Sequence, residues 1–182
     1  METVKGDRLP GWVGRETLVF AVSHSGETDE TLYTVKRAIE SKAQVIAVSR
    51  GGELGALGQE LALPFVEVPP GFRASTAVAY LIIPLLLICE RLGLTPPLGE
   101  AIPETVGLLR ARCEQYGRES PSSANLAKQL AGWLLKKLPV VYGTEGLAAM
   151  AAYRWKCQFN ETAKVPAYWN VFTELNHNEV VG

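Results

Sequence analysis

The sequence has no excess of charge of either sign. Its 182 residues include 18 Lys and Arg against 19 Asp and Glu, which gives a net charge of -1. A nucleic-acid-binding protein usually presents a basic face to the phosphates, so this balance argues against nucleic acid as a partner. The same balance argues against an acidic disordered chain. The class that remains is an ordinary globular protein.

Cysteine and histidine are scarce. The three cysteines are Cys89, Cys113 and Cys157, and no CxxC motif occurs. An odd number of widely spaced cysteines does not predict a disulfide framework, so we expect a reducing, cytoplasmic setting. The two histidines, His24 and His177, lie in opposite halves of the chain. Neither has the neighbouring ligands of a zinc site, so we expect no metal.

No hydrophobic run is long enough to cross a bilayer. The longest apolar run extends over residues 77–89 and contains Pro84, whereas a membrane-spanning helix needs about 20 apolar residues. The chain does not open with the charged and then apolar segments of a secretory signal. We therefore expect no membrane partner. We assign the run to a core helix, which Pro84 would kink or end early.

Apolar runs and helical periodicities alternate through the first half of the chain. Residues 17–22, 44–48 and 64–68 are expected to form strands that are buried on both faces. Helical patterns follow each of these strands. Strands that alternate with helices predict an α/β fold with a parallel sheet covered by helices.

A second α/β unit is expected to start near residue 138. Residues 138–142 predict a strand, and a helix is expected over residues 147–160 after a glycine-containing turn. The same order of strand, turn and helix occurs over residues 17–40, so the sequence predicts two copies of one module. The expected domains are residues 1–95 for the first unit, 96–137 for a connection of two helices, and 138–182 for the start of the second unit.

A hydroxyl-rich turn, Ser-His-Ser-Gly-Glu-Thr, follows the first predicted strand at residues 23–28. Ligands of open α/β sheets bind at the carboxyl ends of the strands, where a helix N-terminus offers N–H groups and partial positive charge. Ser23, Ser25 and Thr28 add hydroxyl donors, and Gly26 lets an anion approach the backbone. No P-loop lysine is present, so the turn favours a phosphomonoester over a nucleotide. Alternatively, the hydroxyls only cap the following helix.

The turn resembles the phosphosugar-binding loop of the sugar isomerase (SIS) domain, Ser-x-Ser-Gly-x-Thr. Two later stretches are more specific, namely Asn-Glu-x-x-Lys within residues 159–172 and Glu-Leu-Asn-His-Asn-Glu-Val-Val-Gly at residues 174–182. Both are similar to stretches of the bifunctional phosphoglucose/phosphomannose isomerases of archaea and some bacteria. This resemblance covers residues 15–182. It implies SIS-type parallel sheets flanked by helices, of the flavodoxin-like class.

The resemblance also implies a reaction. The family interconverts glucose 6-phosphate or mannose 6-phosphate with fructose 6-phosphate through an enediol, without a metal or other cofactor. It implies that Glu161 is the catalytic base and that Arg73 stabilises the enediolate. His177 would open the sugar ring, reaching into the neighbouring subunit's site of a homodimer. The implied phosphate-binding residues are Ser23, Ser25 and Thr28.

The family's pattern extends beyond both ends of the chain. A further strand with a Gly-Gly-Ser turn would precede residue 15, and a lysine that closes the site would follow residue 182. We therefore expect this chain to be the middle of a longer isomerase. Two alternatives stay open. In the first, the chain is a non-catalytic module that binds a sugar phosphate and needs the hydroxyl turn but neither Glu161 nor His177. In the second, the chain is a fragment that is inactive by itself.

Overall fold

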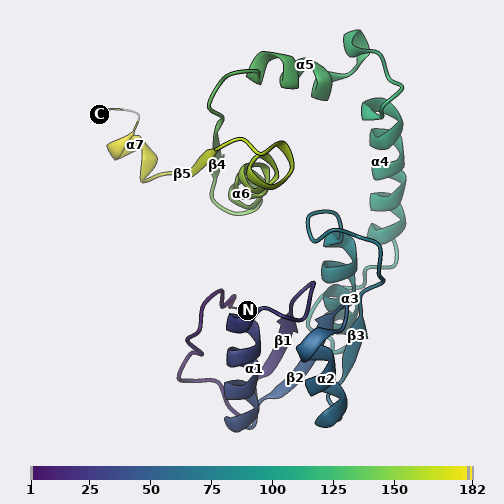
Figure 1. Ribbon diagram of the computed structural model, residues 1–182, viewed down its shortest axis with the longest axis vertical. Coiled ribbons are helices and arrows are strands. Elements are labelled where there is room, and N and C mark those ends of the chain that lie inside the picture. The colour runs from purple at the N-terminus through teal and green to yellow at the C-terminus, as the bar shows by residue number, and fades with distance from the viewer. Residues whose placement is uncertain (1, 180, 182) are drawn as a thin grey trace. The chain divides into compact units, whose positions relative to one another are not determined.

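The computed structural model describes residues 2–179 and residue 181. The chain divides into two compact units, Met1–Leu98 and Gly99–Gly182 (Figure 1). Within the described residues, each unit contains one parallel sheet, of three strands in the first and two in the second. The predicted α/β class with parallel sheets is therefore confirmed. The finer domain bounds, with residues 96–137 as a connection, stay a prediction.

The sheet of the first unit has the order β1-β2-β3. Its strands are β1 (Leu18–Val22), β2 (Gln44–Ser49) and β3 (Phe65–Glu67). Each lies within one residue of its predicted bounds at both ends. In the register of the sheet, Val22 lies beside Val48 and Val48 beside Val66. All three strands run in one direction, so their carboxyl ends share one edge of the sheet.

Both faces of this sheet are covered. On one face, α1 (Asp29–Glu40) and α2 (Gly52–Glu60) pack against alternate strand residues such as Val45 and Ala47. On the other face, Val48 lies in a cluster with partly buried side chains of α3 (Val78–Arg91). Burial on both faces explains the nearly continuous apolar sequence of β2, whereas β1 is mostly half-buried and Phe65 and Glu67 of β3 are exposed, so the burial expected for all three strands holds for β2 alone.

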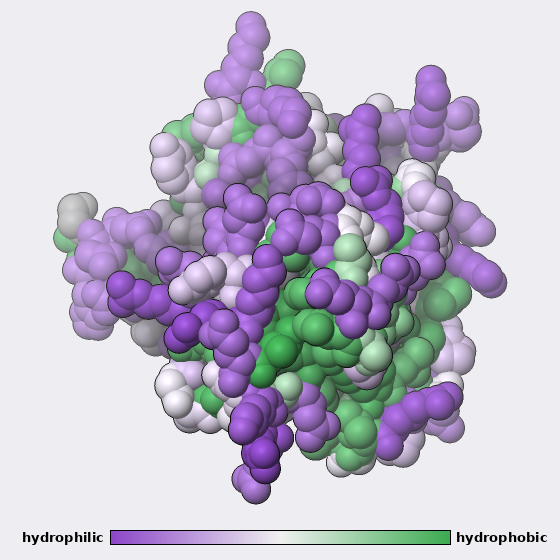
Figure 2. Space-filling view, turned by 60° about the horizontal axis from the view of Figure 1, so that its bottom comes forward, coloured by the Kyte–Doolittle hydropathy of each residue, from purple (hydrophilic) through white to green (hydrophobic). Residues whose placement is uncertain are grey.

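Helix α3 differs from its prediction in two ways. It runs through Pro84 without a break, so of the two effects expected of Pro84, a kink or an early end, the early end does not occur. None of its residues is fully buried in the structure, so its assignment as a core helix is also wrong. Only one side of α3 packs on the sheet, whereas Ile82, Leu86 and Leu87 are exposed. Figure 2 shows a surface on which hydrophobic side chains gather into one continuous area.

The second unit begins with helices and continues with a β-α-β arrangement. Strands β4 (Val140–Thr144) and β5 (Tyr168–Phe172) pair in parallel, and α6 (Leu147–Gln158) connects them with the following turn. The predicted helix over residues 147–160 is confirmed except at its end, where a π-helical turn, η2 (Phe159–Ala163), continues it. The other helical elements of this unit are α4 (Ala101–Tyr116), η1 (Ser122–Ala124), α5 (Leu126–Leu134) and α7 (Leu175–Asn178).

Candidate functional site

The loop between β1 and α1 contains the predicted hydroxyl cluster. Ser23 is 5% exposed. Its Oγ accepts a hydrogen bond of 3.1 Å from the Gly26 N–H and lies 2.8 Å from the Thr28 Oγ1. The Ser25 Oγ accepts a hydrogen bond of 3.1 Å from the Glu27 N–H. Each serine hydroxyl therefore binds a backbone N–H of its own loop. The hydroxyls of Ser23 and Thr28 lie side by side at the start of α1.

Thr28 is the N-cap residue of α1, but its side chain makes no capping hydrogen bond. The hydroxyl is turned toward Ser23 instead of toward the helix N–H groups. The alternative in which the hydroxyls only cap the helix therefore does not describe Thr28. An N-terminus without a side-chain cap keeps N–H donors and partial positive charge available to an anion.

A second loop, between β2 and α2, packs against the first. Gly26 has a φ of 78°, and a Cβ at this position would overlap the Gly51 carbonyl oxygen. The Arg50 N–H donates to the His24 carbonyl at 3.1 Å, and the Leu54 N–H donates to the Gly26 carbonyl at 3.0 Å. Only glycine combines this backbone conformation with such a close approach. The conformation of the hydroxyl loop, residues 23–28, is thus fixed by its contacts with the loop between β2 and α2.

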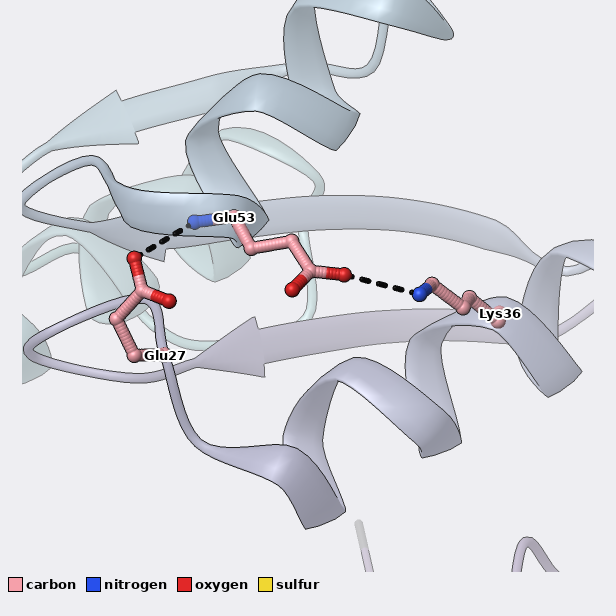
Figure 3. A network of polar contacts seen from close by, with 3 residues as sticks. All are labelled: Glu27, Lys36 and Glu53. Atoms are coloured by element: carbon pink, nitrogen blue, oxygen red, sulfur yellow. Dashed lines mark hydrogen bonds and ion pairs between the residues drawn. The ribbon is translucent and has the colours of Figure 1, made fainter.

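Glu27 links the hydroxyl loop to α2. Its Oε1 accepts a hydrogen bond of 3.0 Å from the Glu53 N–H, and the Glu53 Oε1 pairs with the Lys36 Nζ of α1 at 3.0 Å (Figure 3). The ion pair is half-exposed and contributes little to stability. The carboxylate at the start of α2 is favoured by the helix dipole. The Glu53 N–H at the start of α2 is therefore bound by the Glu27 carboxylate.

Arg73 lies in the exposed turn between β3 and α3. Its carbonyl accepts hydrogen bonds from the N–H groups of Thr76 and Ala77, at 2.9 and 3.0 Å. It also accepts one from the Thr76 hydroxyl at 3.1 Å. The backbone of Arg73 is thus tied to the start of α3 while its side chain is exposed. The hydroxyl loop follows the carboxyl end of β1, and Arg73 lies in the segment that follows the carboxyl end of β3 in the same parallel sheet.

Glu161 lies in the π-helical turn η2 of the second unit, and its side chain is exposed. The turn ends at Lys164 in the left-handed conformation, with a φ of 56°. The pKa of Tyr153 is raised, mainly by a hydrogen bond with Cys157 and to a smaller degree by the Glu161 carboxylate. Turns of the π type inside helices are frequent at functional sites. The π geometry has no local sequence signal that could have predicted it.

His177 lies in α7, a helix of four residues. Leu175 of this helix is completely buried, whereas His177 is exposed. Beyond the helix, the Glu179 carboxylate accepts hydrogen bonds from the Tyr142 hydroxyl, at 2.9 Å, and from the Asn170 side-chain amide. None of these three residues was predicted from the sequence. A polar Asn inside an otherwise apolar strand was the signal that could have indicated them.

The chain has relatives among known proteins. A family profile matches residues 123–182, and it describes the bacterial phospho-glucose isomerase C-terminal SIS domain. A bifunctional phosphoglucose/phosphomannose isomerase of Caldicellulosiruptor bescii is 43% identical over 174 residues, which are 96% of this chain and 51% of that protein. The chain is thus similar to this isomerase along nearly its whole length. The Thermoplasma acidophilum isomerase of the same name is 37% identical over 95% of this chain and 51% of that protein.

The fold is shared with a solved structure. A chain from Salmonella typhimurium, described as a phosphosugar isomerase, superimposes with a TM-score of 0.62 over 93% of this chain and 51% of that chain, at 18% identity. The resemblance stated from the sequence is thus confirmed as a similarity to these isomerases, and the fold is shared. The chain spans about half the length of the curated relatives that it matches.

The residues that the isomerase resemblance predicts fall into two groups. The hydroxyl loop and Arg73 lie in the first unit, and Glu161 and His177 lie in the second. Ser23, Ser25 and Thr28 are brought together in one loop. The part of the chain that the structure describes contains no group of three or more His, Cys, Asp or Glu able to hold a metal ion. Nor does any helix in that part have the length and hydropathy required to cross a membrane.

Proposed function

We propose that the complete gene product containing these residues is an aldose–ketose isomerase of sugar 6-phosphates. It would interconvert glucose 6-phosphate or mannose 6-phosphate with fructose 6-phosphate through an enediol. The observation that carries the proposal is the hydroxyl loop at the uncapped start of α1, in a chain related to such isomerases over 96% of its length. Hydroxyls and N–H groups at a helix N-terminus suit a phosphate monoester.

In this proposal the first unit binds the phosphate and stabilises charge. Thr28 and the N–H groups at the start of α1 contact the phosphate, with Ser23 and Ser25 supporting the loop and contributing hydroxyls. The Arg73 guanidinium lies opposite the enediolate oxygen as negative charge develops there. The exposed side chain of Arg73 on a fixed backbone supports this role.

The second unit moves protons. His177 transfers a proton between the ring oxygen and the C1 hydroxyl, so that the sugar opens. The Glu161 carboxylate then removes the proton from C2 while O1 takes up a proton, which gives the enediol. It returns the proton to C1 while the O2 hydroxyl gives one up, which gives the ketose. Glu161 and Arg73 supply the base and the positive charge that the reaction needs. The proposed mechanism therefore uses no metal and no other cofactor.

The proposed function is tested by incubating the complete gene product with glucose 6-phosphate or mannose 6-phosphate. We expect fructose 6-phosphate to form from both substrates, as measured by a coupled assay. Binding of the sugar phosphates without turnover would instead support the non-catalytic sugar-phosphate-binding module. Activity of the isolated 182-residue chain would separate a working enzyme from an inactive fragment.

We further propose a cytoplasmic homodimer in which His177 reaches the neighbouring subunit's site, acting in glycolysis and gluconeogenesis. Three free thiols, at Cys89, Cys113 and Cys157, support a reducing compartment.

The shared site predicts that inactive Glu161→Gln and His177→Asn proteins complement each other after mixing and subunit exchange. One intact site per mixed dimer should restore about a quarter of wild-type activity. Isomerase activity that stays at the level of the separate variants would contradict the shared site.

A further inference from the structure

Two polar side chains converge on one carboxylate at the sheet of the second unit. Tyr142 and Asn170 are directly adjacent on the paired strands β4 and β5. The Tyr142 hydroxyl donates to the Glu179 Oε2 at 2.9 Å, and the Asn170 Nδ2 donates to the Glu179 Oε1. Each oxygen of the Glu179 carboxylate thus has its own donor on a different strand.

Both donors are held in place by the sheet. The Asn170 Oδ1 accepts a hydrogen bond of 2.8 Å from the Val171 N–H, which leaves its Nδ2 to face Glu179. The ring of Tyr142 packs against Phe172 with ring centres 5.9 Å apart and planes at 73°. The pairing of β4 and β5 therefore places the two donors that bind the Glu179 carboxylate. Hydrogen bonds to a charged acceptor are stronger than those between neutral groups.

The short helix α7 lies between two attachments. Leu175, at its start, is completely buried, and Glu179 follows its last residue. His177 lies between these two attachments and is exposed. A helix of four residues is not stable by itself, because the conformational entropy lost in forming the first turn exceeds the free energy gained from its hydrogen bond. The direction of the His177 side chain therefore depends on how both ends of α7 are held.

We propose that Glu179 is a positioning residue, whose carboxylate binds Tyr142 and Asn170 and thereby holds the His177 imidazole in the direction that sugar-ring opening requires. This inference rests on the proposed isomerase function for its catalytic consequence. Glu179 itself does not contact the substrate in this proposal. It acts only through the backbone turn that it shares with His177.

The charge of Glu179 also keeps its partner protonated. The hydrogen bond to Glu179 is the main cause that raises the pKa of Tyr142 above its ordinary value of 10.0. A tyrosine with a raised pKa stays a hydrogen-bond donor throughout the neutral range. The Tyr142 hydroxyl therefore remains available as a donor to the Glu179 carboxylate at neutral pH.

The first test needs no enzymatic activity. The chain has two histidines, so the imidazole NMR spectrum of the 182-residue protein shows one signal each for His24 and His177. In Glu179→Ala we expect the His177 signal to shift and sharpen as α7 becomes mobile, while the His24 signal stays unchanged. An unchanged His177 signal would overturn the proposal.

A matched control is available on the same helix. Glu174→Gln removes an equal charge next to α7, but within the described part of the chain the Glu174 carboxylate accepts a hydrogen bond only from the Asn178 side-chain amide, at 3.4 Å. We expect the His177 signal of this variant to match the wild type. A shift as large as that of Glu179→Ala would mean that charge alone affects His177, which would overturn a role through Tyr142 and Asn170.

The second test uses the kinetics of the complete gene product. Glu179→Ala should lower kcat about tenfold or more and leave KM within about twofold, because misplacing a catalytic group affects the reaction and not phosphate binding. The Glu179→Ala/His177→Asn double variant should be no slower than His177→Asn alone, since Glu179 acts only through His177. A further loss in the double variant would indicate a general structural role and overturn the proposal. A wild-type protein without isomerase activity would refute the proposed function, and the NMR result would still decide whether Glu179 positions His177.

Discussion

Replacing Glu161 with Gln in the complete gene product is expected to lower kcat by about a thousandfold. The amide has nearly the size of the carboxylate and keeps a hydrogen-bonding oxygen, but it cannot accept the C2 proton. KM for glucose 6-phosphate should stay within about threefold, because the proposed mechanism assigns phosphate binding to the hydroxyl loop and not to Glu161. The loss should also abolish exchange of the C2 proton with solvent, which NMR in heavy water measures directly.

A control for this variant lies in the same π turn. Thr162 follows Glu161, and its hydroxyl donates to the Gln158 side-chain oxygen at 2.8 Å. Thr162→Val disturbs the turn at the surface without removing a carboxylate, so we expect nearly wild-type turnover. Normal turnover by Glu161→Gln would exclude Glu161 as the base. An equal loss in both variants would show that the shape of the turn, and not the carboxylate, limits the reaction.

The second large effect is expected for Gly26→Ala. A residue with a side chain pays about 1–2 kcal/mol for the left-handed backbone at this position. In addition, the new Cβ would overlap the Gly51 carbonyl, so the β1–α1 and β2–α2 loops must separate. We expect a total loss of about 3 kcal/mol in the free energy of unfolding. The displaced loop should bind sugar phosphates at least about tenfold more weakly, as measured by titration calorimetry.

Gly93 provides the matched control for this substitution. It has a φ of 70°, close to the 78° of Gly26, but no heavy atom lies within 4 Å of the position of its Cβ. Gly93→Ala should therefore cost only the backbone term of about 1 kcal/mol and leave phosphate binding unchanged. If denaturation curves showed equal losses for the two variants, the close contact between the loops would not contribute to stability.

Much of the first unit was predictable because its signals are local. Apolar runs of strand length, separated by helical periodicity, predict a parallel sheet without knowledge of any contact. The hydroxyl turn could be placed at a strand end for the same reason. By contrast, α3 was assigned to the core because its sequence is apolar, yet burial depends on what lies against each side of the helix. Composition alone does not provide that information.

The candidate site shows the same division. Ser23, Ser25 and Thr28 were found from one short motif, but their contacts were not. The structure turns the Thr28 hydroxyl toward Ser23 and leaves the N-terminus of α1 without a side-chain cap. Glu27 was taken as an unspecified residue of the motif, and the structure uses its carboxylate to bind the start of α2. Neither outcome follows from the spacing of the motif.

By itself, the sequence determined the α/β class, the strand positions of the first unit and the loop that carries the hydroxyls, because each depends on residues within one turn or one strand. The tertiary structure decided which glycine must lack a side chain, since Gly26 meets Gly51 of another loop. It also decided that Glu179 joins Tyr142 and Asn170. Contacts between residues far apart in the chain depend on strand pairing and packing, and no local pattern encodes them.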